Sequence, residues 1–249
     1  MSSPYINRFV QPDTIIPELS NPQSWNRYSY VTNRPVNFND PTGHRPCDDV
    51  DENGNCIDNE QRNKRLQKDL DKFVPPEKVG WDDMKKVGIG KRVQLLTPGE
   101  YDMFFLIKLR THDGLDTLSL TKMYFILNNA TDTTFELFSH VSKDGHNDPA
   151  DAFRHAYWNA LITRDLGADF AKQFTTAHET RPDSVREEAF MDLHNNQIGR
   201  DIALANPNAT DAELQAAVLD SLYNGELYVW DGNNIYFSNQ CPDCWWRAK

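Results

Sequence analysis

The stretch from His146 to Arg200 carries polar side chains at helical spacing among apolar neighbours, and this pattern constrains the fold more than any other feature. It reads HNDPADAFRHAYWNALITRDLGADFAKQFTTAHETRPDSVREEAFMDLHNNQIGR. Residues three or four positions apart share one face of a helix. The stretch therefore predicts three helices with polar groups on their inward faces. Because buried polar groups need partners, these helices are expected to satisfy one another around a common site.

The first predicted helix begins at Asp148 and Pro149, an N-cap followed by a proline that is tolerated at the first helical position. Asp151, His155 and Asn159 follow at intervals of four residues, so they line one face of the helix. Apolar neighbours flank that face, which indicates that it is not an ordinary solvated surface.

The second predicted helix runs from about Asp165 to Glu179, and in it His178 ends a line of apolar residues that contains Phe170 and Phe174. Its polar end is therefore expected to point towards the same region as the polar face of the first helix.

The third predicted helix begins after Pro182, where Ser184 and Glu187 have the spacing of a capping box. Further along, Asp192 and Asn196 interrupt a stripe of otherwise small or apolar residues. The stripe predicts that both polar side chains face inwards.

Imidazole, carboxylate and carboxamide groups that converge in this way can hold a metal ion or perform acid–base chemistry. His194 is an outer candidate, since two residues of helix turn it about 200° away from Asp192. The predicted catalytic residues are His155, His178, Asp192, Asn159, Asn196, His146 and His194. The predicted ligands of a divalent metal, whose identity the sequence leaves open, are His155, His178 and Asp192.

Each candidate also has a purely structural interpretation. Asp151 occupies the third helical position, where a carboxylate interacts favourably with the helix dipole. His178 lies near a helix C-terminus, which favours a partly charged imidazole. Asn195 and Asn196 could be hydrogen-bonded amides of the core. The sequence alone leaves both interpretations open.

Composition limits the classes of partner. The chain has 249 residues, enough for one or two domains with a real core, and a net charge of -11. Proteins that wrap nucleic acids usually have a basic face, so the negative net charge gives no strong indication of nucleic-acid binding. A bound divalent metal would, however, change the sign of the local charge. The longest apolar run, Met103 to Ile107, is too short to predict a transmembrane segment, and no signal peptide is visible.

The four cysteines form two close pairs at opposite ends of the chain: Cys47 with Cys56, and Cys241 with Cys244. Two short disulfides and one joint metal site are both compatible with this arrangement. The second pair has the spacing of a metal-binding knuckle, whereas the first is too widely spaced to complete such a site. We favour a disulfide between Cys47 and Cys56 in an oxidising compartment.

An acidic segment fits the calcium-loop pattern D-x-[DN]-x-[DN]-G-x5-E, with oxygen-bearing ligands around the sharp turn at Gly54. The predicted Ca²⁺ ligands are Asp49, Asp51, Asn53, Asn55 and Glu60. A helix is predicted to leave this loop, over residues 58–73, but none enters it. An acidic, turn-rich linker is therefore the alternative. Calcium here would stiffen the junction between neighbouring segments.

The rest of the chain predicts further helices, over residues 97–109, 115–128, 133–141 and 210–223. A loop with Gly80, Gly88 and Gly90 precedes the first of these. Two apolar segments around Asp231 to Asn234 predict a β-hairpin. The expected fold class is mainly α (α+β), a helical bundle with a small C-terminal β-hairpin.

Residues 4–46 contain the motifs R-F-x-x-P-D, N-R-Y-S-Y-V-x-N-x-P and D-P-T-G in this order. They resemble the end of the RHS-repeat-associated core, a family that builds a β-cocoon shell around a variable C-terminal toxin. The residues themselves predict one strand at 27–31. The resemblance implies an extended core remnant in a secreted or cell-surface protein, with an RHS shell or parent protein as partner. Residues 12–17 lack the glycine of the family's first D-P-x-G motif, so self-cleavage is not implied.

The sequences D-A-F-R-H-A-Y-W-N-A, A-H-E and D-L-H-N-N-Q-I-G-R, within about residues 140–235, resemble an uncharacterised helical domain found at the toxin position of RHS proteins. A weaker similarity links the first motif to helical secreted phospholipases A2, where an aspartate follows the catalytic histidine; Ala156 follows His155 here. Neither resemblance implies a catalytic role. The converging polar side chains themselves predict a metal-assisted hydrolase that acts on a phosphoester or lipid-like substrate. The alternative is a non-catalytic binding, adhesion or structural tip of an RHS cell-surface protein.

These resemblances and patterns divide the chain into four parts: a core remnant (1–46), a calcium-loop-like junction (47–60), a helix and linker (61–90) and an effector-like domain (91–249). Effectors of this type travel with a cognate immunity protein. The flanks of the expected site are acidic, which would favour a partner with a basic face. The acids concerned are Asp144, Asp148, Asp165, Asp169, Glu179 and Asp183.

Overall fold

The computed structural model describes residues 2–3, 8–9, 59–89, 92–103, 117–140 and 146–240. The chain divides into two compact units, Met1–Asp69 and Leu70–Lys249. The first unit contains the short antiparallel strands β1 (Ser2–Ser3) and β2 (Arg8–Phe9). The predicted strand at 27–31, the four cysteines and the calcium loop up to residue 58 lie outside the described residues.

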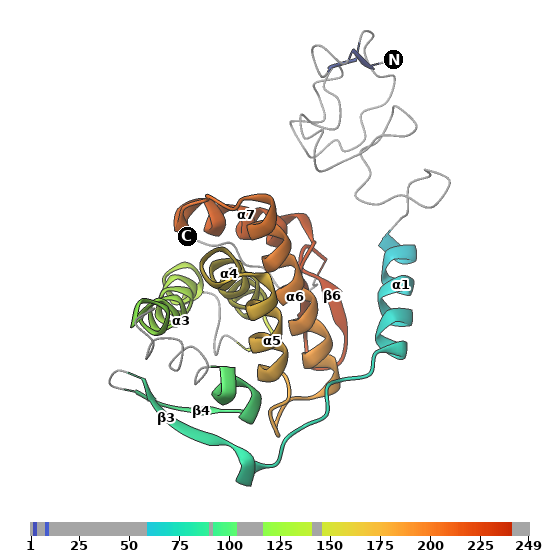
Figure 1. The fold of residues 1–249 in the computed structure, drawn as a ribbon. Helices are drawn as coiled ribbons and strands as arrows, with labels where there is room; N and C mark the ends of the chain where they lie inside the picture. The colour runs from blue at the N-terminus through green and yellow to red at the C-terminus, as the bar shows by residue number, and fades with distance from the viewer. Residues whose placement is uncertain are drawn as a thin grey trace. The chain divides into compact units, whose positions relative to one another are not determined.

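The second unit is mainly helical, which confirms the predicted fold class (Figure 1). Helix α4 (Pro149–Leu166) is almost wholly buried and packs against its four helical neighbours. These neighbours are α3 (Thr117–Phe138), α5 (Ala168–His178), α6 (Arg186–Ala205) and α7 (Asp211–Asn224). The core is formed largely by apolar side chains of α4 together with those that face it from α3, α5 and α7.

Helix α4 begins and ends where local chemistry predicts. Asp148 Oδ1 accepts hydrogen bonds from the backbone N–H groups of Ala150 (2.8 Å) and Asp151 (3.1 Å), and Pro149 occupies the first helical position. The helix ends at Gly167, whose φ of 95° is a conformation that side chains with a Cβ rarely adopt. The predicted second helix starts three residues later than expected because this glycine separates it from the first.

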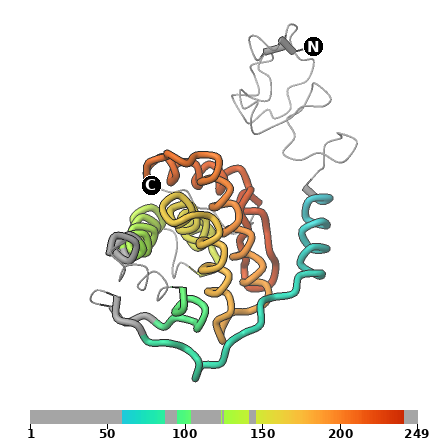
Figure 2. The backbone as a smooth tube through the Cα atoms, in the orientation of Figure 1, coloured from blue at the N-terminus to red at the C-terminus, as the bar shows by residue number. Residues whose placement is uncertain are grey.

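Helices α4 and α6 lie side by side in the tube view of Figure 2, and a glycine allows their close approach. A Cβ atom built on Gly199 would lie 2.0 Å from the carbonyl oxygen of Ala156. The backbones of the two helices therefore touch at this point. Because the helices lie so close, His155, which precedes Ala156, is within reach of Asn196, about one turn before Gly199 on α6.

Helix α6 begins one residue later than the predicted capping box. The backbone N–H of Val185 donates to Glu188 Oε2 (3.3 Å), so the box does not pair Ser184 with Glu187. Helix α7 confirms its prediction: Glu213 N–H donates to Thr210 Oγ1 (3.3 Å), and the Glu213 carboxylate accepts from the Thr210 N–H (2.8 Å).

Two predictions of local structure are wrong. Residues 117–138 form one helix, not two segments, because no glycine or proline interrupts the chain. Within it, the hydroxyls of Thr131 and Thr134 bond to carbonyls one turn back. The expected glycine loop contains an antiparallel hairpin, β3 (Lys85–Ile89) with β4 (Arg92–Leu96). A short η3 helix (Trp81–Asp83) precedes the hairpin.

The C-terminal hairpin is confirmed, with β5 (Tyr228–Trp230) antiparallel to β6 (Ile235–Phe237). The carboxamide of Asn195 on α6 bonds both backbone groups of Tyr228, accepting from N–H at 2.8 Å and donating to C=O at 3.0 Å. Asn195 is therefore a satisfied core amide that fixes the hairpin against α6.

Helix α1 (Asn59–Lys72) confirms the helix predicted after the acidic loop. Its Glu60 side chain accepts a hydrogen bond from Lys64 Nζ at 2.6 Å. Residues 98–103 are also helical, and the predicted capping box between Thr97 and Glu100 is present. None of the helices among the described residues combines the length and the apolar character needed to cross a membrane.

Candidate functional site

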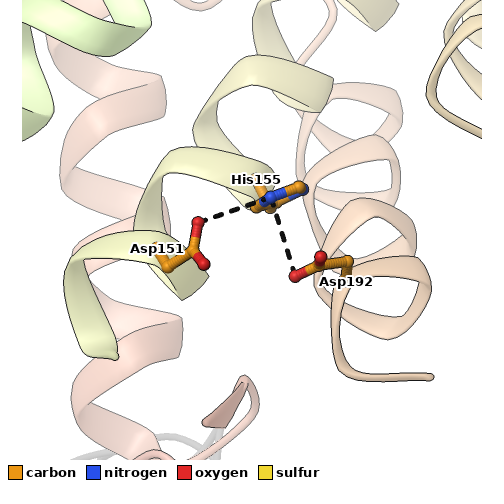
Figure 3. Close-up of side chains that lie close together, drawn as sticks. All are labelled: Asp151, His155 and Asp192. Atoms are coloured by element: carbon orange, nitrogen blue, oxygen red, sulfur yellow. Dashed lines mark ion pairs between the residues drawn. The ribbon is translucent and has the colours of Figure 1, made fainter. Parts of the chain in front are cut away.

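Three side chains from two helices point towards one another in the core: Asp151 and His155 of α4 and Asp192 of α6 (Figure 3). His155 Nε2 lies 3.4 Å from Asp151 Oδ1 and 3.6 Å from Asp192 Oδ1. All three residues are at most 5% exposed. The spacing of four along α4 places the first two on one face, as predicted, and the close contact with α6 supplies the third.

This buried group could hold a metal ion, because one potential ligand atom from each residue lies within 4.8 Å of the others. Asp192 Oδ1 is buried and accepts no hydrogen bond from any residue that the structure describes. A carboxylate oxygen without a donor is unfavourable in the core. A cation between these three groups would supply the missing interaction.

Asp151 is held from its other side. Its Oδ2 accepts a hydrogen bond from the backbone N–H of Asn147 at 2.6 Å, and its Oδ1 accepts from Arg154. Asn147 has a φ of 60°, a left-handed conformation that asparagine tolerates better than most residues. The carboxylate therefore has a fixed orientation before any ligand binds.

Beneath His155 lies a hydrogen-bonded network of buried side chains. His155 Nδ1 lies 3.2 Å from Asn196 Oδ1, which also accepts from Asn159 Nδ2 at 2.5 Å. Asn196 Nδ2 donates to Glu179 Oε1 at 3.2 Å. Arg200 Nη1 donates to Asn159 Oδ1 at 3.0 Å. The predicted core-amide interpretation of Asn196 is thus correct.

Burial dominates the electrostatics of the site. It lowers the pKa of His155 to about 4, although the Asp151 carboxylate acts in the opposite direction. It raises the pKa of Asp192 well above its usual range, and the nearby carboxylates of Glu179 and Asp151 add to this effect. It also raises the pKa of Glu179 to about 7. The carboxyl groups are crowded with too little positive charge to balance them, and a divalent cation would relieve this.

The cluster forms the floor of a pocket of about 210 Å³. Carboxylates outnumber guanidinium groups in its wall, where Arg154 and Arg181 provide the two arginines. The lining residues are His146, Asp151, Arg154, His155, His178, Glu179, Arg181, Asp183, Ser184, Glu188 and Asp192. The carboxylates would repel a small anionic ligand, so such a ligand could bind only together with a cation or in direct contact with these arginines.

His178 lies beside the cluster rather than in it. Its Nδ1 is 2.8 Å from Glu100 Oε1, and its ring centroid is 6.3 Å from that of His155. Burial would lower the pKa of His178, but the hydrogen bond and charge of Glu100 raise it above its usual value. His178 is a wall residue, and among the described residues the potential metal group does not include it. Its predicted role as a ligand is not supported.

The two remaining histidine candidates, His146 and His194, lie in different parts of the structure. His146 lies at the mouth of the pocket, with Nε2 3.1 Å from Glu188 Oε1. His194 faces away from it, stacked on Tyr228 with 3.6 Å between ring centroids, and its Nε2 lies 2.8 Å from the carbonyl oxygen of Glu226. The helical rotation of about 200° between His194 and Asp192 predicted this separation.

Asn159 and Asn196, which the sequence offers as catalytic candidates, lie in the core below the pocket. Both are 0% exposed, and neither lines the pocket. Their side chains lie below His155, because a further turn along each helix leads into the core rather than towards the pocket. They support the site instead of touching a ligand.

Three contributors were missed as site residues from the sequence. In the sequence, Asp151 has a sufficient explanation in the helix dipole, Glu179 stands among the acids that flank the expected site, and Arg200 has no predicted role. The signal for Asp151 was its spacing of four from His155. Glu179 and Arg200 had no such signal, because their burial at 4% and 5% depends on how the helices pack.

A family model described as a domain of unknown function (DUF6973) matches residues 115–226. This span includes α3 to α7 and therefore all three residues of the potential metal group. No curated protein and no solved structure matches the chain. The function must therefore be inferred from the site itself.

Proposed function

We propose that the helical unit is a metal-assisted hydrolase in which Asp151, His155 and Asp192 hold a divalent cation. One observation carries the proposal: three acceptor-bearing groups converge in the core, and Asp192 Oδ1 has no donor among the described residues. Imidazole and carboxylate together suit divalent metals such as Zn²⁺ or Mn²⁺. The hydrogen bonds to Asp151 and His155 orient both ligands, as partners behind metal ligands commonly do.

The wall of the pocket favours a phosphoester as substrate. A divalent metal can lower the pKa of a bound water and polarise a phosphoryl oxygen. Arg154 and Arg181 line the same pocket and can pair with an anionic phosphoryl group. In hydrolysis, a water oxygen bonds to phosphorus, the ester P–O bond breaks, and the departing oxygen takes up a proton. A lipid-like substrate would have to present its phosphate to the same arginines.

The proposal is tested by metal content and phosphodiester hydrolysis in the full chain. We expect one divalent ion per chain after incubation with Mg²⁺, Mn²⁺ or Zn²⁺, and hydrolysis of bis(p-nitrophenyl) phosphate that a chelator abolishes. Asp192→Asn should lose the ion and the activity. Asp183→Asn is the matched control, since it makes the same change at an exposed position of the same pocket and should keep the ion.

A wild-type chain that binds none of these ions would contradict the proposal. The alternative, a non-catalytic binding or structural tip, would then be preferred. In that case the polar network is a satisfied core feature whose loss lowers stability without changing any activity.

The biological setting that we propose is the C-terminal tip of an RHS-type polymorphic toxin, secreted or displayed at the cell surface. Its support is the motif order in residues 4–46. The expected partners are an RHS shell or parent protein and a cognate immunity protein. Intracellular expression tests this setting: the wild-type chain should inhibit growth, His155→Ala should not, and the product of the adjacent reading frame should bind the chain and relieve inhibition. Normal growth with the wild-type chain would remove this support.

Calcium at the junction is a separate proposal. Four of the five expected ligands lie outside the described residues, and Glu60 is exposed on the first turn of α1 beside Lys64. We expect calorimetry to show calcium binding that Glu60→Gln weakens strongly, because the last position of such a loop supplies a bidentate ligand. Identical heats for both chains would contradict it.

A further inference from the structure

A chain of hydrogen bonds runs through the core from Arg200 to the ring of His155, and its direction is fixed at the far end. A guanidinium can only donate hydrogen bonds and is always charged. Arg200 Nη1 lies 3.0 Å from Asn159 Oδ1, so this atom must be the acceptor oxygen of the carboxamide. The hydroxyl oxygen of Thr175 lies 3.1 Å from the same oxygen and 2.9 Å from the carbonyl oxygen of Ala171, so it shares its one hydrogen between two acceptors.

The orientation of Asn159 fixes that of Asn196. With its oxygen held by Arg200, Asn159 presents its NH₂ group to the carbonyl oxygen of His155 (3.0 Å) and to Asn196 Oδ1 (2.5 Å). Asn196 is held a second time, because its Nδ2 donates to the Glu179 carboxylate at 3.2 Å. Neither amide can be reversed without placing donor against donor or acceptor against acceptor.

Asn196 in turn determines which ring nitrogen of His155 carries a proton. Asn196 Oδ1 is an acceptor, and His155 Nδ1 lies 3.2 Å from it, so Nδ1 must donate. In a neutral imidazole the other nitrogen then has a lone pair. That nitrogen, Nε2, faces Asp151 Oδ1 and Asp192 Oδ1 at 3.4 and 3.6 Å. Three acceptors therefore converge where a cation would bind.

We propose that Arg200 is a positioning residue that sets the tautomer of His155 through Asn159 and Asn196, which makes Nε2 the metal-ligating atom. The tautomer itself does not depend on the proposed function. Only the consequence for metal affinity rests on it.

The cost of burying Arg200 supports this role. Arg200 is 5% exposed, and no ion pair in the described part of the chain involves it; burial lowers its pKa, against the effect of the nearby Asp201 carboxylate. The hydrogen-bond acceptors of Arg200 among the described residues are neutral: Asn159 Oδ1, Thr175 Oγ1 and Gln197 Oε1, the last at 2.8 Å. A buried charge without a carboxylate partner is expensive. A glutamine at this position could reverse its amide and present an acceptor instead of a donor. Arginine can only donate, so it fixes the direction of the whole series of hydrogen bonds up to His155.

Nitrogen NMR of the full, metal-free chain with ¹⁵N-labelled histidine tests the proposal at pH 8, above the ordinary histidine pKa. The signals of His155 are assigned by their absence in His155→Asn. Wild-type His155 should be protonated at Nδ1 alone. In Arg200→Gln and Asn196→Leu, protonation at Nε2 should become substantial, and the Kd for Zn²⁺ should rise by about 10–100-fold.

Two variants separate this role from a general loss of packing. Asn195→Leu makes the same change one residue earlier on α6, in an equally buried amide that bonds β5 instead of His155. It should lower stability and leave the tautomer unchanged. Asn196→Asp keeps an acceptor opposite Nδ1 and should retain Nδ1 protonation.

Wild-type His155 protonated at Nε2, or an unchanged tautomer in folded Arg200→Gln or folded Asn196→Leu, would overturn the proposal. Should Arg200→Gln fail to fold, the Asn196 pair of variants still decides. If His155 has the expected tautomer but the chain binds no Zn²⁺, only the hydrolase proposal is contradicted. Failure of the tautomer proposal can therefore be distinguished from failure of the proposed function.

Discussion

Individual side chains at this site combine features that favour ligand binding over stability. Asp192 is buried beside two other carboxylates, and burial raises its pKa well above the usual range. Its Oδ1 has no hydrogen-bond donor among the described residues. In the absence of a cation, such a group stabilises the fold little or not at all.

Asp192→Asn should therefore separate binding from stability. In EDTA at pH 7.5 the free energy of unfolding should stay within about 1 kcal/mol of wild type or rise, because a buried acid crowded by other carboxyl groups is replaced by a neutral amide. Urea titration followed by circular dichroism measures it. A loss of more than about 2 kcal/mol would mean that the carboxylate has a structural partner and would argue against a metal ligand.

The helix pair α4 and α6 positions all three potential ligands. Their backbones meet where Gly199 faces Ala156, and this contact places Asp192 opposite His155. Beside this pair, the end of α5 is fixed by a partly buried ion pair between His178 and Glu100. Each of these contacts is testable by one substitution.

Gly199→Ala should destabilise the protein by about 3 kcal/mol, because the new methyl group would overlap the backbone of Ala156 and force the two helices apart. Helix propensity alone predicts the opposite, a gain of up to about 1 kcal/mol. Denaturant unfolding decides the sign. A more stable variant would show that α4 and α6 do not pack this closely.

The pair of His178 and Glu100 should make stability depend on pH. The pKa of His178 is raised, so its contribution is complete below its unfolded value of about 6.5 and is lost as the pH rises through the folded value. Burial would raise the pKa of Glu100, but His178 and Thr97 lower it, so its contribution is complete above about 4.5 and is lost at lower pH.

The difference in unfolding free energy between wild type and Glu100→Gln should therefore be largest between about pH 4.5 and 6.5. Comparing the two chains cancels most of the effects of Glu179 and Arg181, which also interact with His178. Thermal or urea unfolding across pH 4 to 9 measures it. A difference that does not vary with pH would contradict an ion pair at this position.

At the scale of the whole helical unit, metal binding should be linked to stability. A ligand that binds only the folded state stabilises it by about 2.7 kcal/mol at a concentration one hundred times its Kd. The melting temperature of the wild-type chain should rise with the cation and fall again with a chelator. Asp192→Asn should show neither change. An equal rise in both chains would place the binding elsewhere.

Local signals in the sequence determined the helices at this site. The Asp148–Pro149 cap, the capping box at Thr210 and the intervals of four between Asp151, His155 and Asn159 depend only on short-range geometry. Where the expectations are wrong, the reasons differ: no glycine or proline divides residues 117–138, so they form one helix, whereas cross-strand pairing decides the hairpin β3–β4.

Tertiary packing decided which polar residues meet. Spacing along α4 could not tell that Asp192 would complete the cluster, that His178 would pair with Glu100, or that Arg200 would be buried below Asn159. Periodicity gives the face on which a side chain lies, but not the rotation and approach of the neighbouring helix. Here that approach depends on one close contact, Gly199 against Ala156, which determines that the polar faces of α4 and α6 enclose a common site.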